Sequence, residues 1–182
     1  MTMTPTLASA ISEAMIKQAG TPKRKVFISY HHEQDQPYFD FLSKHFSGNL
    51  GLFFDRSLDD RIESNDVDYT HRRIREKHIQ GSSITIVLCG VETYKRKWID
   101  WEIHSTLEYK HALLGIRLPN CTTLPNRLFQ NYHSGHAHLI EWDHALWESN
   151  PLQFIREIET AVFKSSIGSP TNNLLQMARN RS

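Results

Sequence analysis

The segment from Gly90 to Glu102 holds the side chains of this sequence that are best suited to chemistry. Trp98 and Glu102 are four positions apart, a spacing that puts both on one face of a helix. A carboxylate in the first turns of such a helix, facing a crevice, could accept hydrogen bonds from ribose hydroxyls or stabilise a positively charged sugar transition state. From spacing alone, the alternative stays open that Trp98 packs in the core and Glu102 is an exposed acid.

Strands and helices alternate along the chain on both sides of this segment. Residues 84–89 form a nearly unbroken apolar run, typical of a parallel strand that is buried on both faces. We predict strands over residues 25–30, 50–54, 84–89, 113–118 and 138–142, and helices over residues 35–46, 66–79, 98–111 and 151–163. This alternation predicts an α/β fold with a mainly parallel sheet.

An open parallel sheet binds ligands beyond the carboxyl ends of its strands, where the strand order reverses. If the strands follow the flavodoxin-like order 2-1-3-4-5, that crevice lies between the first and third strands. Asp55 ends the second strand and could reach the edge of the crevice. The other residues that the crevice would offer are Ser29, Tyr30, His31 and His32 after the first strand, and residues 90–98, from Gly90 to Trp98, after the third.

The chain length and the net charge limit the classes of function that the protein can have. The 182 residues suffice for one domain with modest extensions, and 21 Lys and Arg against 20 Asp and Glu leave a net charge of +1. This near-neutral balance argues against a dedicated nucleic-acid binder, and short basic runs such as residues 95–97 are explained as solvated faces. No stretch approaches the roughly 20 apolar residues that span a bilayer, and we expect no signal peptide, because the first residues lack its basic start and long apolar run. We therefore expect a cytoplasmic protein that contacts no membrane.

Breaker residues suggest how the chain is divided. We expect residues 1–24 to form a helical extension and linker, because apolar residues at helical spacing are followed there by Gly20-Thr21-Pro22. Residues 25–164 are predicted to form the domain. Residues 165–182 are expected to be a loose tail, with one helical turn over residues 174–179.

Cysteine and histidine give little indication of other chemistry. Cys89 and Cys121 are too few for a disulfide framework, so both are expected to be reduced thiols. His133, His136 and His138 have a spacing that could bind a metal in a loop, but no cysteine accompanies them. We predict that the chain has no metal site.

Four stretches together resemble the TIR-like domain of bacterial Thoeris anti-phage systems. The resemblance spans residues 25–120 and keeps its motifs in order. A tryptophan and a glutamate at this spacing would be a weak signal alone, but here they follow a buried strand and a Gly-x-Glu-Thr motif. The stretches are Lys25–Asp35, Phe53–Leu58, Gly90–Glu102 and Leu113–Ile116.

The resemblance implies a flavodoxin-like TIR fold, with a mainly parallel five-stranded sheet in the order 2-1-3-4-5 and helices on both faces. It also implies that the protein binds NAD and breaks the bond between nicotinamide and ribose. In that family the glutamate of the motif is catalytic, which assigns this role to Glu102. Trp98 would pack the motif helix and contact the dinucleotide, and Ser29, Tyr30 and His31 would line the cleft.

The resemblance further implies that ADP-ribose is cyclised into a second messenger. This product would activate a separate NAD-depleting effector during phage infection, in answer to a trigger that the sequence does not name. No cofactor is expected beyond NAD as the substrate, and self-association into a homo-oligomer is expected by analogy. Residues 121–138 match no motif.

Two other functions stay open at this point. The chain could be a non-enzymatic TIR module that acts by self-association or by binding a partner. It could also be a nucleoside-transferring enzyme, or one that hydrolyses NAD to linear ADP-ribose, with the same crevice. Glu102 favours an enzyme, because a scaffold has no chemical need for that acid.

Overall fold

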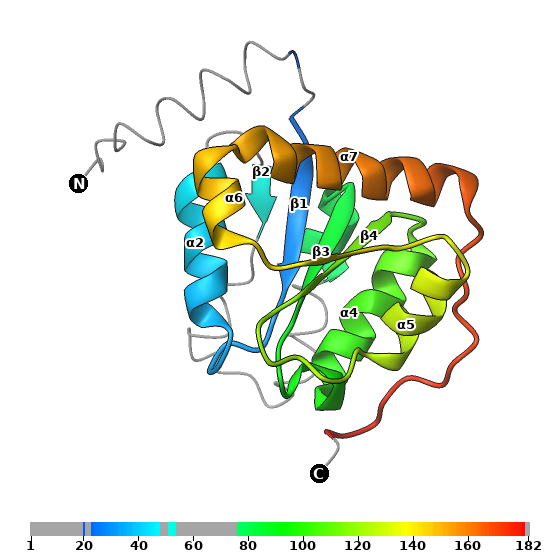
Figure 1. The fold of residues 1–182 in the computed structure, drawn as a ribbon. Coiled ribbons are helices and arrows are strands. Elements are labelled where there is room, and N and C mark those ends of the chain that lie inside the picture. Colours follow the sequence, from blue (N-terminus) through cyan, green and yellow to red (C-terminus); the bar gives the residue numbers. More distant parts are fainter. Residues whose placement is uncertain (1–19, 21–22, 48–50, 54–75, 181–182) are drawn as a thin grey trace.

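The computed structural model describes residue 20 and residues 23–47, 51–53 and 76–180 (Figure 1). Several predictions therefore lie outside the described residues. These are the N-terminal helix, Asp55, the loop that follows Asp55, and the helix over residues 66–79 except for its end. Residues 76–81, at that end, are helical.

Five parallel strands form one sheet in the order β2-β1-β3-β4-β5, which confirms the predicted order (Figure 1). Every pairing is parallel, and β3 lies at the centre with all of its residues buried. The structure thus places the switch of strand order at β1 and β3, as expected for a flavodoxin-like fold. The strands are β1 (Lys25–Ser29), β2 (Gly51–Phe53), β3 (Ile84–Cys89), β4 (Ala112–Arg117) and β5 (His138–Glu141).

Helices cover both faces of the sheet (Figure 1). Alternate side chains of β3 point to opposite faces, because successive residues of a strand do so. Ile86 lies in one apolar cluster with residues of α2, α6 and α7, and Val87 in another with residues of α4 and α5. The described helices are α2 (Gln36–Phe46), the short 3₁₀ helix η2 (Thr93–Lys95), α4 (Lys97–Glu108), α5 (Asn126–His133), α6 (His144–Ser149) and α7 (Pro151–Ile167), in addition to residues 76–81.

Two helices, α5 and α6, have no counterpart among the predictions. Both are short, and α5 is mainly polar, with Leu128 as a fully buried apolar residue. A stronger signal was present for α6, because Asp143 is a suitable N-cap residue and its carboxylate accepts a hydrogen bond from the Leu146 amide.

The C-terminal segment is fastened to the domain, contrary to the expected loose tail. Residues 174–179 form no helical turn. The segment runs past α5 and α4, and we call its residues 171–180 the strap (Figure 1). Asn131 of α5 binds the Thr171 backbone twice, at 2.8 Å to its carbonyl and 2.9 Å to its amide.

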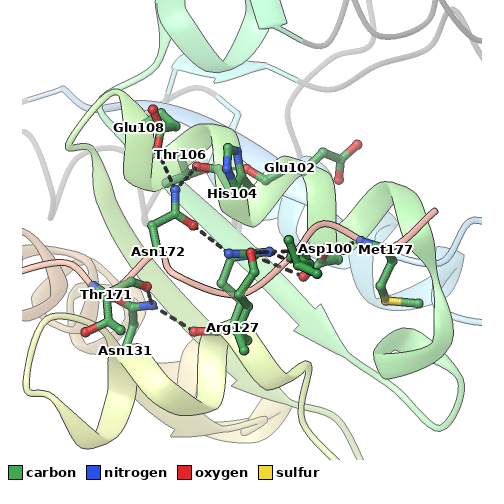
Figure 2. A network of polar contacts seen from close by, with 12 residues as sticks. Asp100, Glu102, His104, Thr106, Glu108, Arg127, Asn131, Thr171, Asn172 and Met177 are labelled. Atoms are coloured by element: carbon green, nitrogen blue, oxygen red, sulfur yellow. Dashed lines mark hydrogen bonds and ion pairs between the residues drawn. The ribbon is translucent and has the colours of Figure 1, made fainter.

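Arg127 is the centre of this attachment (Figure 2). Its side chain is fully buried and pairs with Asp100 of α4 through Nε, 3.1 Å from Oδ1. The same guanidinium donates to Asn172 Oδ1 at 2.7 Å and to the Leu174 carbonyl at 3.0 Å. A buried charge is tolerated only when it is paired and hydrogen-bonded, so α4, α5 and the strap are tied together.

Removing Arg127 should therefore unfold the domain more readily. We expect Arg127→Met to lower the free energy of unfolding by about 3–5 kcal/mol, because it leaves the Asp100 carboxylate buried without its cation. Arg24→Met is the matched control: Arg24 also makes a two-bonded pair, with Glu159, but at a partly exposed position. Its expected loss is about 1 kcal/mol or less. Urea unfolding measures both, and equal losses would contradict the assigned role of Arg127.

Candidate active site

A pocket of ≈ 240 Å³ lies between the loop that follows β1 and the first turns of α4. Because α4 follows β3, the pocket occupies the predicted switch point of the sheet. Its wall combines aromatic rings with charged groups. The lining residues are Phe27, Ile28, Tyr30, His31, His32, Glu33, Arg96, Trp98, Ile99, Glu102 and Asn180.

Glu102 is a buried acid at this pocket and not the exposed acid of the alternative interpretation. It is only 5% exposed, and Ser29 at the end of β1 donates a hydrogen bond to its Oε2 at 2.5 Å. Ser29 itself is not a described lining residue, although the sequence placed it in the cleft. Its hydroxyl instead holds the carboxylate, which fixes the position of Glu102 relative to the sheet.

A second contact fixes the backbone of α4 at the same residue. Thr106 Oγ1 donates to the Glu102 carbonyl at 2.8 Å, and Thr85 Oγ1 of β3 lies 2.7 Å from Thr106 Oγ1. A hydroxyl has one proton, so Thr85 must be the donor in its contact with Thr106. The helix is thus pinned to β1 and β3, the two strands that border the pocket.

Tyr30 and His31 line the pocket, as the sequence predicted. The Tyr30 ring stacks on Phe39 at 4.7 Å, and its hydroxyl donates to Gln36 at 3.0 Å. Burial lowers the pKa of His31, and the positive charge of Arg96 lowers it further. Both effects favour a neutral imidazole, which adds no positive charge to the pocket.

Trp98 both packs and lines the pocket. Its ring lies against the apolar cluster of Phe27, Ile79 and Trp101, with an edge contact of 6.4 Å between the two indole rings. Lys97 Nζ lies 4.7 Å from the centre of the Trp98 ring, within the range of a cation–π contact. One indole therefore stabilises the start of α4 and supplies an apolar wall.

Arg96 is a charged lining residue that lies within the predicted stretch over residues 90–98 but was given no role of its own. Its Nε is buried and has no hydrogen-bond partner among the described residues, and Nη2 lies 3.8 Å from Glu92. The sequence favours a solvated face for the basic run over residues 95–97. The position of this run directly before the motif helix, at the switch point, is the signal that indicates a binding role for Arg96.

Gly90 is not among the described lining residues, although the sequence predicted a binding role for it. A Cβ at this position would overlap the Asp35 carboxylate, so the close approach of that side chain favours glycine here. Thr93 Oγ1 accepts from the Gly90 amide at 2.8 Å and is 3.2 Å from Asp35 Oδ2. Gly90 thus shapes the loop before α4. Asp55, another predicted binding residue, lies outside the described residues.

Other candidate groups of the sequence do not form a site. Burial raises the pKa of the Cys89 thiol well above its usual range, which disfavours the reactive thiolate. His138 pairs with Glu157 at 2.8 Å, His136 is buried and His133 is exposed. Within the described part of the chain, no group of three or more His, Cys, Asp or Glu residues could hold a metal ion.

None of the helices in the described ranges is both long and apolar enough to cross a membrane.

The fold and the pocket define an α/β protein of the flavodoxin-like class with a buried acid at the switch point. The chain belongs to the family of the Thoeris protein ThsB, TIR-like domain, whose model matches residues 27–123, just over half of the chain.

A curated relative from Bacillus cereus (strain MSX-D12) is named "Putative cyclic ADP-D-ribose synthase ThsB1". It is 28% identical over 104 residues, which cover 52% of this chain and 52% of the relative. The chain thus spans about half the length of the curated relative.

Two solved structures are also similar at 14% identity. The TIR domains of the activated Roq1 resistosome, which recognises the effector XopQ, give a TM-score of 0.41 over 83% of this chain and 89% of that one. An NADPH:quinone reductase from Mesorhizobium loti, titled as putative, gives 0.34 over 88% and 48%.

Gly90→Ala should destabilise the loop that leads to α4. The added methyl group would displace the Asp35 carboxylate, and we expect a loss of about 1–3 kcal/mol in the free energy of unfolding. Gly81→Ala is the control, because a Cβ there meets nothing within 4 Å. Adding Asp35→Ala to Gly90→Ala should recover part of the loss in a double-mutant cycle. Fully additive losses would show that the two residues do not conflict.

Acid should destabilise the fold through one buried and three half-buried histidines. Burial lowers the pKa of His31, His104, His111 and His136 from the ordinary 6.5. As the pH falls, these histidines bind protons more readily in the unfolded chain than in the folded one. The free energy of unfolding should therefore fall as the pH drops below 6.5.

Urea unfolding at several pH values measures this slope. His136→Gln should reduce it, because His136 is only 1% exposed and this burial lowers the pKa of its imidazole. His133→Gln, at an exposed position, is the control for loss of a histidine. A slope unchanged by His136→Gln would contradict the assignment.

Proposed function

We propose that this protein is an NAD-processing enzyme of anti-phage defence that splits nicotinamide from ribose and cyclises the remaining ADP-ribose. The observation that carries the proposal is the buried Glu102 carboxylate at the pocket, held by Ser29 at 2.5 Å. Membership of the Thoeris TIR-like family and the printed name of the curated relative support the same chemistry.

The proposed reaction begins with departure of nicotinamide. The bond between the ribose anomeric carbon and the pyridine nitrogen breaks, and its electron pair stays on nitrogen, so neutral nicotinamide leaves. The Glu102 carboxylate holds the ribose hydroxyls and stabilises the positive charge that develops on the sugar. A nucleophilic atom of the same ADP-ribose then bonds to the anomeric carbon and loses a proton. The sum is one nicotinamide, one cyclic ADP-ribose isomer and one proton.

The pocket supports binding of the nicotinamide end of NAD. Its ≈ 240 Å³ is below the roughly 300–1,000 Å³ of typical ligand pockets, so it suits half of a dinucleotide. Trp98 and Tyr30 offer ring surfaces to the nicotinamide, whose positive charge a neutral His31 does not oppose. Arg96, whose buried Nε has no partner in the described part of the chain, would bind the diphosphate.

In this proposal the cyclic product is a second messenger. It would activate a separate effector that depletes NAD, and an unidentified phage component would trigger its synthesis. A homo-oligomer is proposed by family analogy. NAD serves as the substrate, and no further cofactor is proposed.

Glu102→Gln tests the proposal, because it keeps the size of the side chain and removes its charge. We expect nicotinamide release from NAD to fall by about 100-fold or more. Glu108→Gln is the matched control on the same helix, since Glu108 is exposed and its Oε1 contacts Asn172, outside the pocket. Product analysis by mass spectrometry separates a cyclic isomer from linear ADP-ribose.

Three outcomes would change the conclusion. Equal turnover by wild type and Glu102→Gln would remove Glu102 from the reaction. Linear ADP-ribose as the only product would favour simple NAD hydrolysis. Absence of NAD turnover in triggered cells, with self-association intact, would favour a non-enzymatic TIR module.

A further inference from the structure

The first turn of α4 depends on residues from the far end of the chain. The first amides of a helix have no partner within the helix, and Arg96, at the N-cap position, makes no side-chain cap. Asn180 Oδ1 instead accepts a hydrogen bond from the Lys97 amide at 2.9 Å, across 83 positions of sequence. Because an amide N–H must donate to an oxygen, this contact also fixes which end of the Asn180 amide faces α4.

Asp100 gives the same turn a second attachment to the strap (Figure 2). Its Oδ2 accepts from the Met177 amide at 3.0 Å, and its Oδ1 accepts from Arg127 Nε at 3.1 Å. Asp100 is only 7% exposed. The turn that lies immediately before Glu102 is therefore held by both a buried ion pair and the strap backbone.

Hydrogen bonds, more than apolar burial, hold the strap in place. Leu175 in its middle is 95% exposed. Asn172 lies beside α4, where its Nδ2 donates to the His104 carbonyl at 3.2 Å and to Glu108 Oε1 at 2.8 Å. Hydrogen bonds are directional, so such an attachment fixes the strap in one register along α4.

The strap also reaches the pocket itself. Asn180 is one of the lining residues, together with Arg96 and Glu102. With Oδ1 bound to α4, the Nδ2 protons of Asn180 have no partner among the described residues and are available to a substrate oxygen. All of the strap lies beyond residues 27–123, which the family model matches.

We propose that the strap completes the active site: it positions the first turn of α4, and Asn180 adds an amide donor to the pocket rim for an anionic oxygen of the substrate. Asn180 is then a positioning residue for Glu102 through its oxygen and a substrate contact through its nitrogen. This inference rests on the proposed function for the identity of the substrate. The attachment to α4 can be tested without it.

Two substitutions separate the two roles of Asn180. Asn180→Asp keeps an oxygen for the Lys97 amide but loses the donor, whereas Asn180→Leu loses both. Asn173→Leu is the matched control, because Asn173 is exposed on the same segment. Hydrogen exchange at the Lys97 amide should become roughly fivefold faster in Asn180→Leu and stay near the wild-type rate in the other two. Unchanged exchange in Asn180→Leu would overturn the attachment.

Binding of NAD tests the contact with the substrate. It is measured by calorimetry in the Glu102→Gln background, where turnover does not interfere. Adding either Asn180→Asp or Asn180→Leu should weaken NAD binding by roughly fivefold or more, and adding Asn173→Leu should not change it. Equal affinities in all four proteins would overturn the substrate contact.

Turnover with Glu102 intact tests the positioning. We expect Asn180→Leu to lower kcat and raise KM, and Asn180→Asp to raise KM with kcat near the wild-type value, because small displacements of a catalytic group reduce the rate. Wild-type kinetics in Asn180→Leu would overturn the positioning role. Absence of NAD binding and turnover in the wild type would instead contradict the proposed function, and hydrogen exchange would still decide the attachment.

Discussion

The hydrogen bond between Ser29 and the buried carboxylate of Glu102 is the interaction on which the site depends. A carboxylate removed from water is unfavourable unless hydrogen bonds or charges compensate it, so its partners must be held in place. Ser29 ends β1, Thr85 and Thr106 join β3 to α4, and Asp100 joins the first turn of α4 to α5 and the strap. The two border strands and one helix thus define a single position for the acid.

The fold could be predicted from local patterns because its strands are apolar runs and its longer helices have apolar residues at helical spacing. The apolar run over residues 84–89 forms the fully buried central strand, with the predicted bounds. Helix α4 begins one residue before its predicted start and ends three residues before its predicted end. Differences of this size are expected, because helix ends are poorly defined by local sequence patterns. Short polar helices such as α5 were missed because one buried face of eight residues gives little periodicity.

The site could be predicted where the end of a strand or a local motif marks its residues. Tyr30 and His31 follow β1 at the switch of strand order, and both line the pocket. Trp98 and Glu102 lie in the motif after β3, and the resemblance placed both in the cleft, where the structure has them. Asn180 was missed because its contact with Lys97 spans 83 positions and no periodic pattern records it. Gly90 was assigned to the pocket, whereas it provides room for the Asp35 carboxylate. A glycine in a motif can therefore reflect packing next to a site as well as contact with a ligand.

The central claim is that Glu102 supports synthesis of a nucleotide signal from NAD. Mass spectrometry of small molecules from cells that express wild type or Glu102→Gln, before and after phage challenge, tests it most directly. We expect a cyclic ADP-ribose isomer and released nicotinamide in infected wild-type cells, and neither in the variant. Unchanged NAD and no new nucleotide in both strains, under a phage that the wild type restricts, would contradict it.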